Sequence, residues 1–289
     1  MADTDLIACV YPAYDGNIQD AVKAIELSEG APRYVRGLEK PESRSDRRDR
    51  GSTEEPEQAG GTDRCPHLEL RFSNGPKTPR GFVFGRNEDC DVVLPNFRGV
   101  SSYHFSLTFD DLNRPIVKDI GSLFGTQVTY HDAGQGWRRD FVWIVGDQKV
   151  LRRKNPIVIH VNKHLRFQLV VSPHNVNSQL YKDNVDWFRQ GTAGTENFFD
   201  RLKFPLDTER ATETHTPGKG PIFLRKKLGE GSFGVVTHFW NVSTGEEYAL
   251  KQPSDRAIRE KEVDADLWRR EADIMGRISH VSRCIYTSN

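Results

Sequence analysis

Short apolar stretches separated by turn-forming residues dominate the middle of the chain, from residue 67 to residue 172. Breakers such as SNGP, DDLNRP and DAGQG lie between neighbouring stretches, and none of this region has the helical period. Regular short strands with such breakers predict a β-sandwich. We expect its strands at LELRF, GFVFG, CDVVL, HFSLTF, PIVKDI, TQVTY, FVWIVG, PIVIHV and RFQLVVS.

The flanking segments have different patterns. Residues 1–35 form a short N-terminal segment with a strand-like stretch, Leu6 to Tyr11, followed by apolar residues at helical spacing: Ile18, Ala21, Val22 and Ile25. Residues 36–66 are rich in Arg, Asp, Glu, Ser, Gly and Pro, which is typical of a disordered linker. Residues 173–220 form a second polar connector, and we expect its aromatic pairs, Trp187-Phe188 and Phe198-Phe199, to dock on a neighbouring domain.

From residue 221 to residue 289 the pattern predicts a second, smaller α+β unit. IFLRKKLGEG, SFGVVTHFW and EEYALKQ are three expected strands joined by Gly-rich and Ser-Thr-Gly turns. A charged helix is expected to follow, with one apolar face formed by Leu267, Ile274, Met275 and Ile278. The chain is therefore expected to be multidomain, with an all-β sandwich first and a partial α+β unit after it.

Charge and cysteine usage narrow the classes of partner. The 289 residues contain 41 Lys+Arg and 41 Asp+Glu, so no net field attracts the chain to nucleic acid or an anionic membrane. The four cysteines have no metal-ligand spacing, so we expect reduced thiols and no metal site. The N-terminus lacks the basic residues of a signal peptide, and no apolar run is long enough to span a membrane. An intracellular protein is expected.

The candidate chemistry begins in the run GFVFGRNEDCDVVL and continues in SSYHF. Arg86 follows Gly85 at a turn, where a glycine lets the backbone bend sharply. Ser101 and Ser102 offer hydroxyl and backbone donors, and His104 lies on the next strand, where it can brace the loops. A cation and hydroxyl donors at one rim of a scaffold are suited to a phosphorylated side chain. The alternative is that these are ordinary turn residues of a sandwich that binds something else.

The order of three elements resembles the forkhead-associated (FHA) family: Gly85-Arg86, Ser101-x-x-His104, and Gly125-Thr126 after Asp119-Ile120. The resemblance covers about residues 67–172 and implies a β-sandwich that binds phosphothreonine-containing proteins. It also implies that Arg86 contacts the phosphopeptide and that Ser101 and Ser102 contact the phosphate. The same resemblance gives structural roles to Gly85, His104, Gly125 and Thr126.

The chain departs from the family pattern just before Gly125. Members of the family usually have an asparagine there that holds the peptide backbone, with a polar residue in front of it. Phe124 and Leu123 occupy these positions. We expect one peptide-backbone contact to be lost, Ser122 to substitute for it in part, and sequence selectivity to be altered.

A second motif, Gly229-x-Gly231-x-x-Gly234-x-Val236, lies between two expected strands. Glycines in such a hairpin let backbone N–H groups face the phosphates of a nucleotide. A strand follows the third glycine rather than a helix, which disfavours a dinucleotide site. Glu271 lies on the apolar face of the expected helix and needs a partner there, and Lys251 in YALK is the obvious one. The alternative is a chance hairpin with a surface glutamate.

Residues 222–280 resemble the start of a Ser/Thr protein kinase, up to the end of its αC helix. The resemblance implies ATP as cofactor, with Val236 and Ala249 packing on adenine, Lys251 on the α/β-phosphates and Glu271 orienting Lys251. The implied nucleotide-contacting residues are Leu228, Gly229, Gly231, Gly234, Val236, Ala249 and Lys251. No HRD-x-x-x-x-N, DFG or APE motif occurs, so the Mg²⁺ ligands and the catalytic base are absent. We expect the chain to be catalytically incomplete on its own.

An FHA domain ahead of a kinase lobe resembles the checkpoint kinases, and the chain is expected to be an N-terminal portion of such an enzyme. That resemblance implies phosphothreonine-containing partners, a second kinase molecule among them, and favours the nucleus over the cytoplasm. Two alternatives stay open. One is a stand-alone phosphoprotein adaptor with no enzymatic role, and the other is an enzyme subunit whose kinase fold is completed by another chain.

Overall fold

The computed structural model divides the chain into two compact units, residues 1–218 and residues 219–289. The residues that it describes are 3–14, 17–37, 65–146, 151, 156–192, 217–231, 234–259, 266, 269, 270, 273 and 284–286. Within these residues, no helix is long and apolar enough to cross a membrane.

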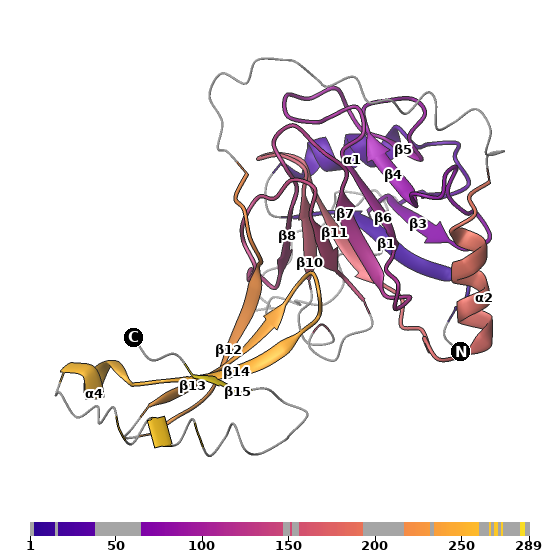
Figure 1. The fold of residues 1–289 in the computed structure, drawn as a ribbon. Helices are drawn as coiled ribbons and strands as arrows, with labels where there is room; N and C mark the ends of the chain where they lie inside the picture. The colour runs from indigo at the N-terminus through magenta and orange to yellow at the C-terminus, as the bar shows by residue number, and fades with distance from the viewer. Residues whose placement is uncertain are drawn as a thin grey trace, which may run out of the picture. The chain divides into compact units, whose positions relative to one another are not determined.

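The first unit is a β-sandwich (Figure 1). Its strands are β1 (Leu6–Pro12), β2 (Tyr34–Val35), β3 (His67–Arg71), β4 (Phe82–Gly85), β5 (Val92–Val93), β6 (Phe105–Phe109), β7 (Pro115–Asp119), β8 (Gln127–Tyr130), β9 (Val142–Ile144), β10 (Ile157–His160) and β11 (Arg166–Val171). In the described part of the chain one sheet has the order β2-β3-β1-β11-β10-β8 and the other β5-β4-β6-β7-β9. The sandwich predicted from the strand pattern is confirmed.

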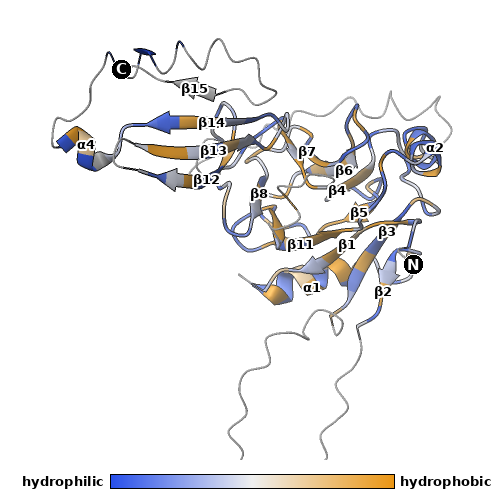
Figure 2. Cartoon of the chain, turned by 90° about the horizontal axis from the view of Figure 1, so that it is seen from below, coloured by the Kyte–Doolittle hydropathy of each residue, from blue (hydrophilic) through white to orange (hydrophobic). Residues whose placement is uncertain are grey.

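Alternation of side chains divides core from surface on some strands, such as β3, whereas β4 and β10 are buried along their whole length. On β3, Leu68 and Leu70 are buried, while His67, Glu69 and Arg71 are only half-buried. Figure 2 shows this alternation of hydrophobic and hydrophilic positions. In the other sheet, Phe84 stacks on Phe105 with ring centroids 4.4 Å apart. The hydroxyl of the fully buried Tyr130 donates to the Ile144 carbonyl at 2.8 Å, so a polar group of one sheet is satisfied by the other.

The N-terminal segment is part of this sandwich. β1 lies between β3 and β11, with Cys9 opposite both Glu69 and Val170. Helix α1 (Ile18–Glu26) follows and packs its buried residues, Ala21, Ala24 and Ile25, towards β1 and β11. The sandwich therefore starts at β1, upstream of the expected boundary at residue 67. The reason is pairing across a long chain separation, which local periodicity does not reveal.

A buried ion pair also ties the N-terminal segment to the other sheet. The Arg33 Nη1 lies 3.7 Å from an Asp91 carboxylate oxygen, with only 11% and 1% of the two side chains exposed. Asp91 also accepts hydrogen bonds from the backbone N–H groups of Lys77 and Val83, at 2.9 and 3.0 Å. Burial raises the pKa of Asp91, and these hydrogen bonds and Arg33 act against that rise.

The connector after β11 contains a helix that docks on the sandwich. Helix α2 (Gln179–Phe188) begins at Ser178, whose hydroxyl accepts the Tyr181 N–H at 3.3 Å. Phe188 is fully buried, and its ring meets Phe82 and Phe109 with centroids 5.3 and 5.0 Å away. The neighbouring Trp187 is 48% exposed, so only one member of this aromatic pair docks fully. The second expected pair, Phe198-Phe199, lies outside the described residues.

The second unit contains a sheet with the order β12-β13-β14-β15. Its elements are β12 (Phe223–Glu230), β13 (Val235–Asn241), β14 (Glu247–Gln252), helix α4 (Asp255–Arg259) and β15 (Cys284–Tyr286). The first three strands are antiparallel, in agreement with the expected hairpins, and β15 runs parallel to β14. The expected apolar helix face, with Glu271, lies outside the described residues, as does most of that helix.

Candidate functional site

Backbone hydrogen bonds join the two loops that carry the candidate phosphate-binding residues. The Arg86 N–H donates to the Ser101 carbonyl and the Asn87 N–H to the Ser102 carbonyl, each at 3.0 Å. The Arg86 turn leaves β4, and the Ser101-Ser102 loop leads into β6, which pairs with β4. The three residues that the sequence singled out are therefore held together at one end of the five-stranded sheet.

Gly85 allows these two loops to approach so closely. A Cβ atom at this position would lie 2.2 Å from the Ser102 carbonyl oxygen and 2.9 Å from the Tyr103 Cα. Both of these neighbours are backbone atoms, so no rotation of a side chain could relieve the clash. Glycine is required here for close packing of two backbones.

His104 supports the loop that carries Ser101 and Ser102. The imidazole is fully buried, and its Nδ1 accepts the Ser101 N–H at 3.1 Å. Burial lowers the pKa of His104 to about 4, while Asp119 and a backbone contact with Gly125 act in the opposite direction. The ring is therefore neutral at neutral pH, cannot reach a ligand, and serves to shape the loop.

Three side chains of these loops could meet a phosphate. The Arg86 side chain is half-buried, and its Nη1 donates to the Asn96 side-chain oxygen at 2.8 Å, which orients the guanidinium. Ser102 is half-buried, and its carbonyl also accepts the Cys90 thiol at 3.4 Å. Ser101 is only 6% exposed, and its hydroxyl accepts the Leu123 N–H at 2.9 Å, which leaves the hydroxyl proton to donate.

Asp119, at the end of β7, organises the neighbouring loop. Its buried carboxylate accepts hydrogen bonds from the backbone of Gly121, Ser122 and Asp140 at 3.0–3.1 Å and from the hydroxyls of Ser122 and Thr126. This role of Asp119 was not predicted from the sequence. The available signal was Asp119-Ile120-Gly121-Ser122, in which the aspartate can accept the backbone N–H two residues later, as in an Asx turn.

Ser122 and Thr126 are both fully buried with their hydroxyls donated to Asp119. Ser122 was expected to contact a peptide in part. Its side chain instead points into the loop, where it stabilises the turn through Asp119. Gly125 has a φ of +82°, and a Cβ there would lie 2.7 Å from the Arg138 carbonyl oxygen. Thr126 exchanges two backbone hydrogen bonds with Arg138, at 2.8 and 2.9 Å.

Leu123 and Phe124, which replace the polar residues of the family pattern, are half-buried at this rim. The Leu123 N–H is bonded to the Ser101 hydroxyl, so the loop lies directly against the serine loop. The Phe124 ring lies near Gly99, at 3.4 Å from the position of an added Cβ. An apolar surface therefore adjoins the basic and hydroxyl groups.

In the second unit, the first two glycines of the motif, Gly229 and Gly231, are exposed. Nothing lies within 4 Å of a Cβ added to Gly229 or Gly231, and the Gly231 N–H donates to the Gly234 carbonyl at 2.9 Å. Lys251 is paired with Val236 across β13 and β14. Leu228 is 56% exposed, and Ala249 is half-buried. The proposed partner of Lys251, Glu271, lies outside the described residues.

The FHA domain family model matches residues 82–168, which include every candidate residue of the phosphate loops. This part of the chain is an FHA domain. No curated protein sequence matches the chain.

Three solved structures match parts of the chain at low sequence identity and low TM-score. Rad53 residues 1–466 in complex with AMP-PNP are 19% identical, with a TM-score of 0.34 and coverage of 69% of this chain and 40% of that chain. The N-terminal FHA domain of S. cerevisiae Rad53p in complex with a phosphothreonine peptide is 21% identical, with a TM-score of 0.25 and coverage of 32% and 67%. An engineered FHA domain with a Myc-pTBD peptide is 20% identical, with a TM-score of 0.29 and coverage of 43% and 91%. The chain thus spans less than half of the Rad53 structure.

Proposed function

We propose that the FHA domain binds phosphothreonine-containing peptides through the loops that carry Arg86, Ser101 and Ser102. The observation that carries this proposal is the pair of backbone hydrogen bonds that places Arg86 beside the two serines. The match of residues 82–168 to the FHA family supports it, because that family binds phosphothreonine peptides.

The chemistry of the rim suits a phosphate group. A phosphothreonine carries close to two negative charges and three acceptor oxygens at neutral pH. The oriented Arg86 guanidinium can pair with one oxygen, while the hydroxyls of Ser101 and Ser102 donate to others. The buried His104 is neutral and therefore adds no charge of its own to the rim.

The 121–125 loop determines how the peptide backbone is held. Leu123 and Phe124 present apolar surface where the family pattern has amide and polar groups. We therefore expect the domain to favour peptides with an apolar side chain beside the phosphothreonine, since apolar contact replaces a hydrogen bond to the peptide backbone.

Fluorescence polarisation with a labelled phosphothreonine peptide library tests this proposal. We expect binding that requires the phosphate and weakens with salt, because the contact is ionic. Arg86→Ala should lower affinity roughly 10- to 100-fold, the usual loss for a hydrogen bond to a charged group. Lys23→Ala, an exposed change on α1, is the matched control and should bind normally. Equal binding of the unphosphorylated library would contradict the proposal.

We further propose that residues 221–289 are the ATP-binding start of a Ser/Thr kinase lobe. The supporting observation is that three neighbouring strands of the sheet, β12 to β14, are antiparallel, that their first hairpin is glycine-rich and that β14 carries Lys251 opposite Val236. Titration with a fluorescent ATP analogue tests it. We expect weak binding that falls at least several-fold in Lys251→Ala and not in Lys226→Ala, an exposed lysine on β12. Equal affinity in the first variant would refute this assignment.

A further inference from the structure

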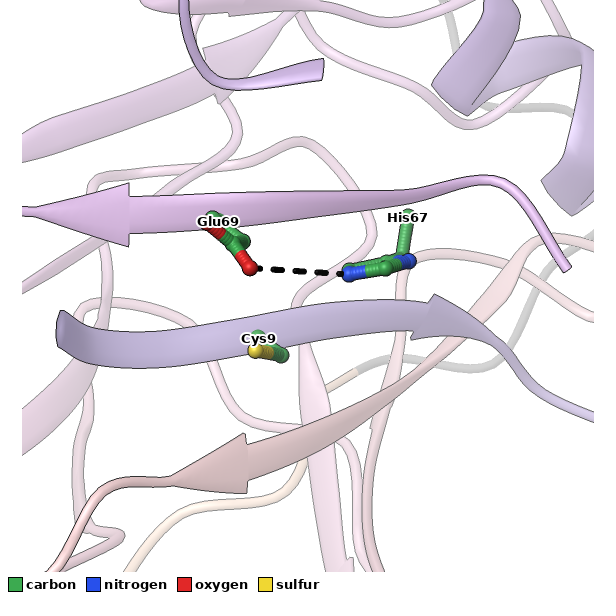
Figure 3. Close-up of side chains that lie close together, drawn as sticks. All are labelled: Cys9, His67 and Glu69. Atoms are coloured by element: carbon green, nitrogen blue, oxygen red, sulfur yellow. Dashed lines mark ion pairs between the residues drawn. The ribbon is translucent and has the colours of Figure 1, made fainter. Parts of the chain in front are cut away.

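A thiol, an imidazole and a carboxylate converge on strands β1 and β3, which contribute none of the phosphate-binding loops. One ligand atom from each of Cys9, His67 and Glu69 lies within 4.8 Å of the others. Figure 3 shows His67 and Glu69 on β3 and Cys9 on the adjacent strand β1. The three types of donor together are those that zinc prefers in proteins.

Strand register explains the convergence. Cys9 on β1 is directly opposite Glu69 on β3, and His67 precedes Glu69 by two residues on the same face. Leu68 and Leu70 alternate with these residues and are buried in the core, so the cluster lies on the outer face of the sheet. Cys9 lies 58 positions before His67 and 60 positions before Glu69, and such long separations hide the cluster from any spacing rule.

The neighbours of His67 leave its Nε2 atom directed towards Cys9 and Glu69, where it could bind a metal. The His67 Nδ1 lies 3.3 Å from the Cys65 carbonyl oxygen, and a carbonyl can only accept, so this nitrogen carries the proton. Nε2 then keeps its lone pair and lies 3.9 Å from the Glu69 Oε1. Tyr11 stacks on the ring at 4.6 Å between centroids and fixes its plane. A backbone carbonyl on the distal nitrogen is the usual second partner of a metal-binding histidine.

Glu69 is oriented in the same way. Its Oε2 accepts a hydrogen bond from the Arg71 Nε at 2.9 Å and lies 2.8 Å from the Arg71 Nη2. Its Oε1 faces His67, and this is the oxygen that remains directed into the cluster. Each of the two β3 donors is therefore held by a neighbour through the atom that faces away from the common centre.

We propose that Cys9, His67 and Glu69 bind a divalent transition metal, zinc in particular, with water as the fourth ligand. Three protein donors leave one position of a tetrahedron open, and the side chains of His67 and Glu69 are 13% and 27% exposed, so water can reach it. A small movement suffices, because ligand atoms around zinc are separated by roughly 3.5 Å when each lies about 2.1 Å from the metal. The thiol proton of Cys9 passes to solvent on binding.

The consequence of such a site would be a cross-link between two strands. Zinc would join β1, which enters the sandwich from the N-terminal segment, to β3. Since the metal binds only the folded arrangement of the three residues, it would stabilise the sandwich by mass action. This inference is independent of phosphopeptide binding, which uses the loops of the other sheet.

Cobalt substitution in the full chain tests the proposal. Co²⁺ bound to a thiolate gives a charge-transfer absorption band in the near ultraviolet, and we expect this band at one metal per chain. Cys9→Ser should abolish the band, while His67→Gln and Glu69→Gln should each weaken binding 10-fold or more. Excess Zn²⁺ should displace the cobalt and raise the melting temperature of the wild-type chain, but not that of Cys9→Ser.

Two control variants identify the ligands. His164→Gln changes an exposed histidine elsewhere on the sandwich, and Cys65→Ser keeps the carbonyl that holds His67, so both should bind cobalt like the wild type. Circular dichroism of each variant checks that it is folded. Absence of the band in the wild-type chain would overturn the proposal, as would a band that persists in folded Cys9→Ser or that depends on Cys65 instead. X-ray absorption at the zinc edge should show one sulfur among the ligands.

Discussion

At the scale of single residues, the phosphate loops depend on groups that cannot touch a ligand. Gly85 permits the contact between two backbones, His104 accepts the Ser101 N–H, and Asp119 accepts the donors of the 121–126 turn. Each of these residues satisfies a buried polar group or removes a steric obstacle. The donors of Arg86, Ser101 and Ser102 are then held in position in the free domain, and for the proposed function this lowers the entropy lost on peptide binding.

Gly85→Ala should damage both folding and binding. The added methyl would lie 2.2 Å from the Ser102 carbonyl oxygen, so the serine loop must move. We expect a loss of about 2 kcal/mol in the free energy of unfolding and a phosphopeptide affinity at least 10-fold lower. Urea denaturation and fluorescence polarisation measure the two effects. Gly229→Ala, where no atom lies within 4 Å of the new methyl, is the control and should leave both values unchanged.

His104 should make the sandwich acid-sensitive. The pKa of His104 is lowered from 6.5 to about 4 in the folded protein, so the unfolded chain binds the proton more readily between these values. The stabilisation is fully present above pH 6.5 and is lost as the pH falls towards 4, by roughly 3 kcal/mol in total. His104→Asn, whose side-chain oxygen can still accept the Ser101 N–H, should flatten this dependence. Urea denaturation at several pH values measures this dependence. An equal loss of unfolding free energy at low pH in the wild type and in His104→Asn would contradict the prediction.

At the scale of elements, segments outside the central strand region complete the sandwich. β1 pairs with β3 and β11, and α2 covers an aromatic cluster formed by side chains from several strands. The aromatic residue Phe188 is fully buried there. A domain cut at the expected boundaries of 67 and 172 would lose both elements and expose their partners to water.

Phe188→Ala should destabilise the sandwich strongly. Its ring packs in edge contact with Phe82 and Phe109, so truncation leaves a cavity between α2 and the sheet. We expect the free energy of unfolding to fall by about 3–4 kcal/mol. Leu180→Ala, on the same helix but 57% exposed, should change it by less than about 0.5 kcal/mol. Similar losses in the two variants, measured by urea denaturation, would show that α2 does not dock through Phe188.

At the scale of the whole molecule, the chain consists of two compact units with different contents. Residues 1–218 hold the FHA domain, and residues 219–289 hold the glycine-rich hairpin and Lys251. Within the described residues, the hydrogen bonds reported above for the phosphate loops join residues of the first unit. Phosphopeptide binding should therefore belong to that unit alone.

A fragment comprising residues 1–218 should fold and bind by itself. We expect its main calorimetric transition to lie within a few degrees of that of the whole chain, since its sandwich and its docked helix are both retained. Its affinity for the phosphothreonine library should match that of the whole chain within about 2-fold. A fragment that aggregates, or that binds much more weakly, would show that the second unit contributes to the site.

Some of this could be predicted from the residues alone. The strands of the sandwich, the helix α1 and the three hairpin strands of the second unit follow from local periodicity and turn residues, which act over a few positions. The adjacency of Arg86 to Ser101 and Ser102 was predicted from their suitability for a phosphate and from the resemblance to the FHA family. It rests on a backbone pairing that no spacing rule contains.

The sequence by itself determined where most of the strands form, because strand propensity and turn residues are local properties. The short strands β2 and β15 were not predicted. Only the tertiary structure decided which strands become neighbours: β1 enters between β3 and β11, and this places Cys9 opposite Glu69 and near His67. It also decided that Ser122 faces Asp119 rather than solvent. Both outcomes depend on tertiary contacts: strand pairing in the first case and a buried turn in the second. Strand pairing stabilises the fold only after segments far apart in the sequence have come together.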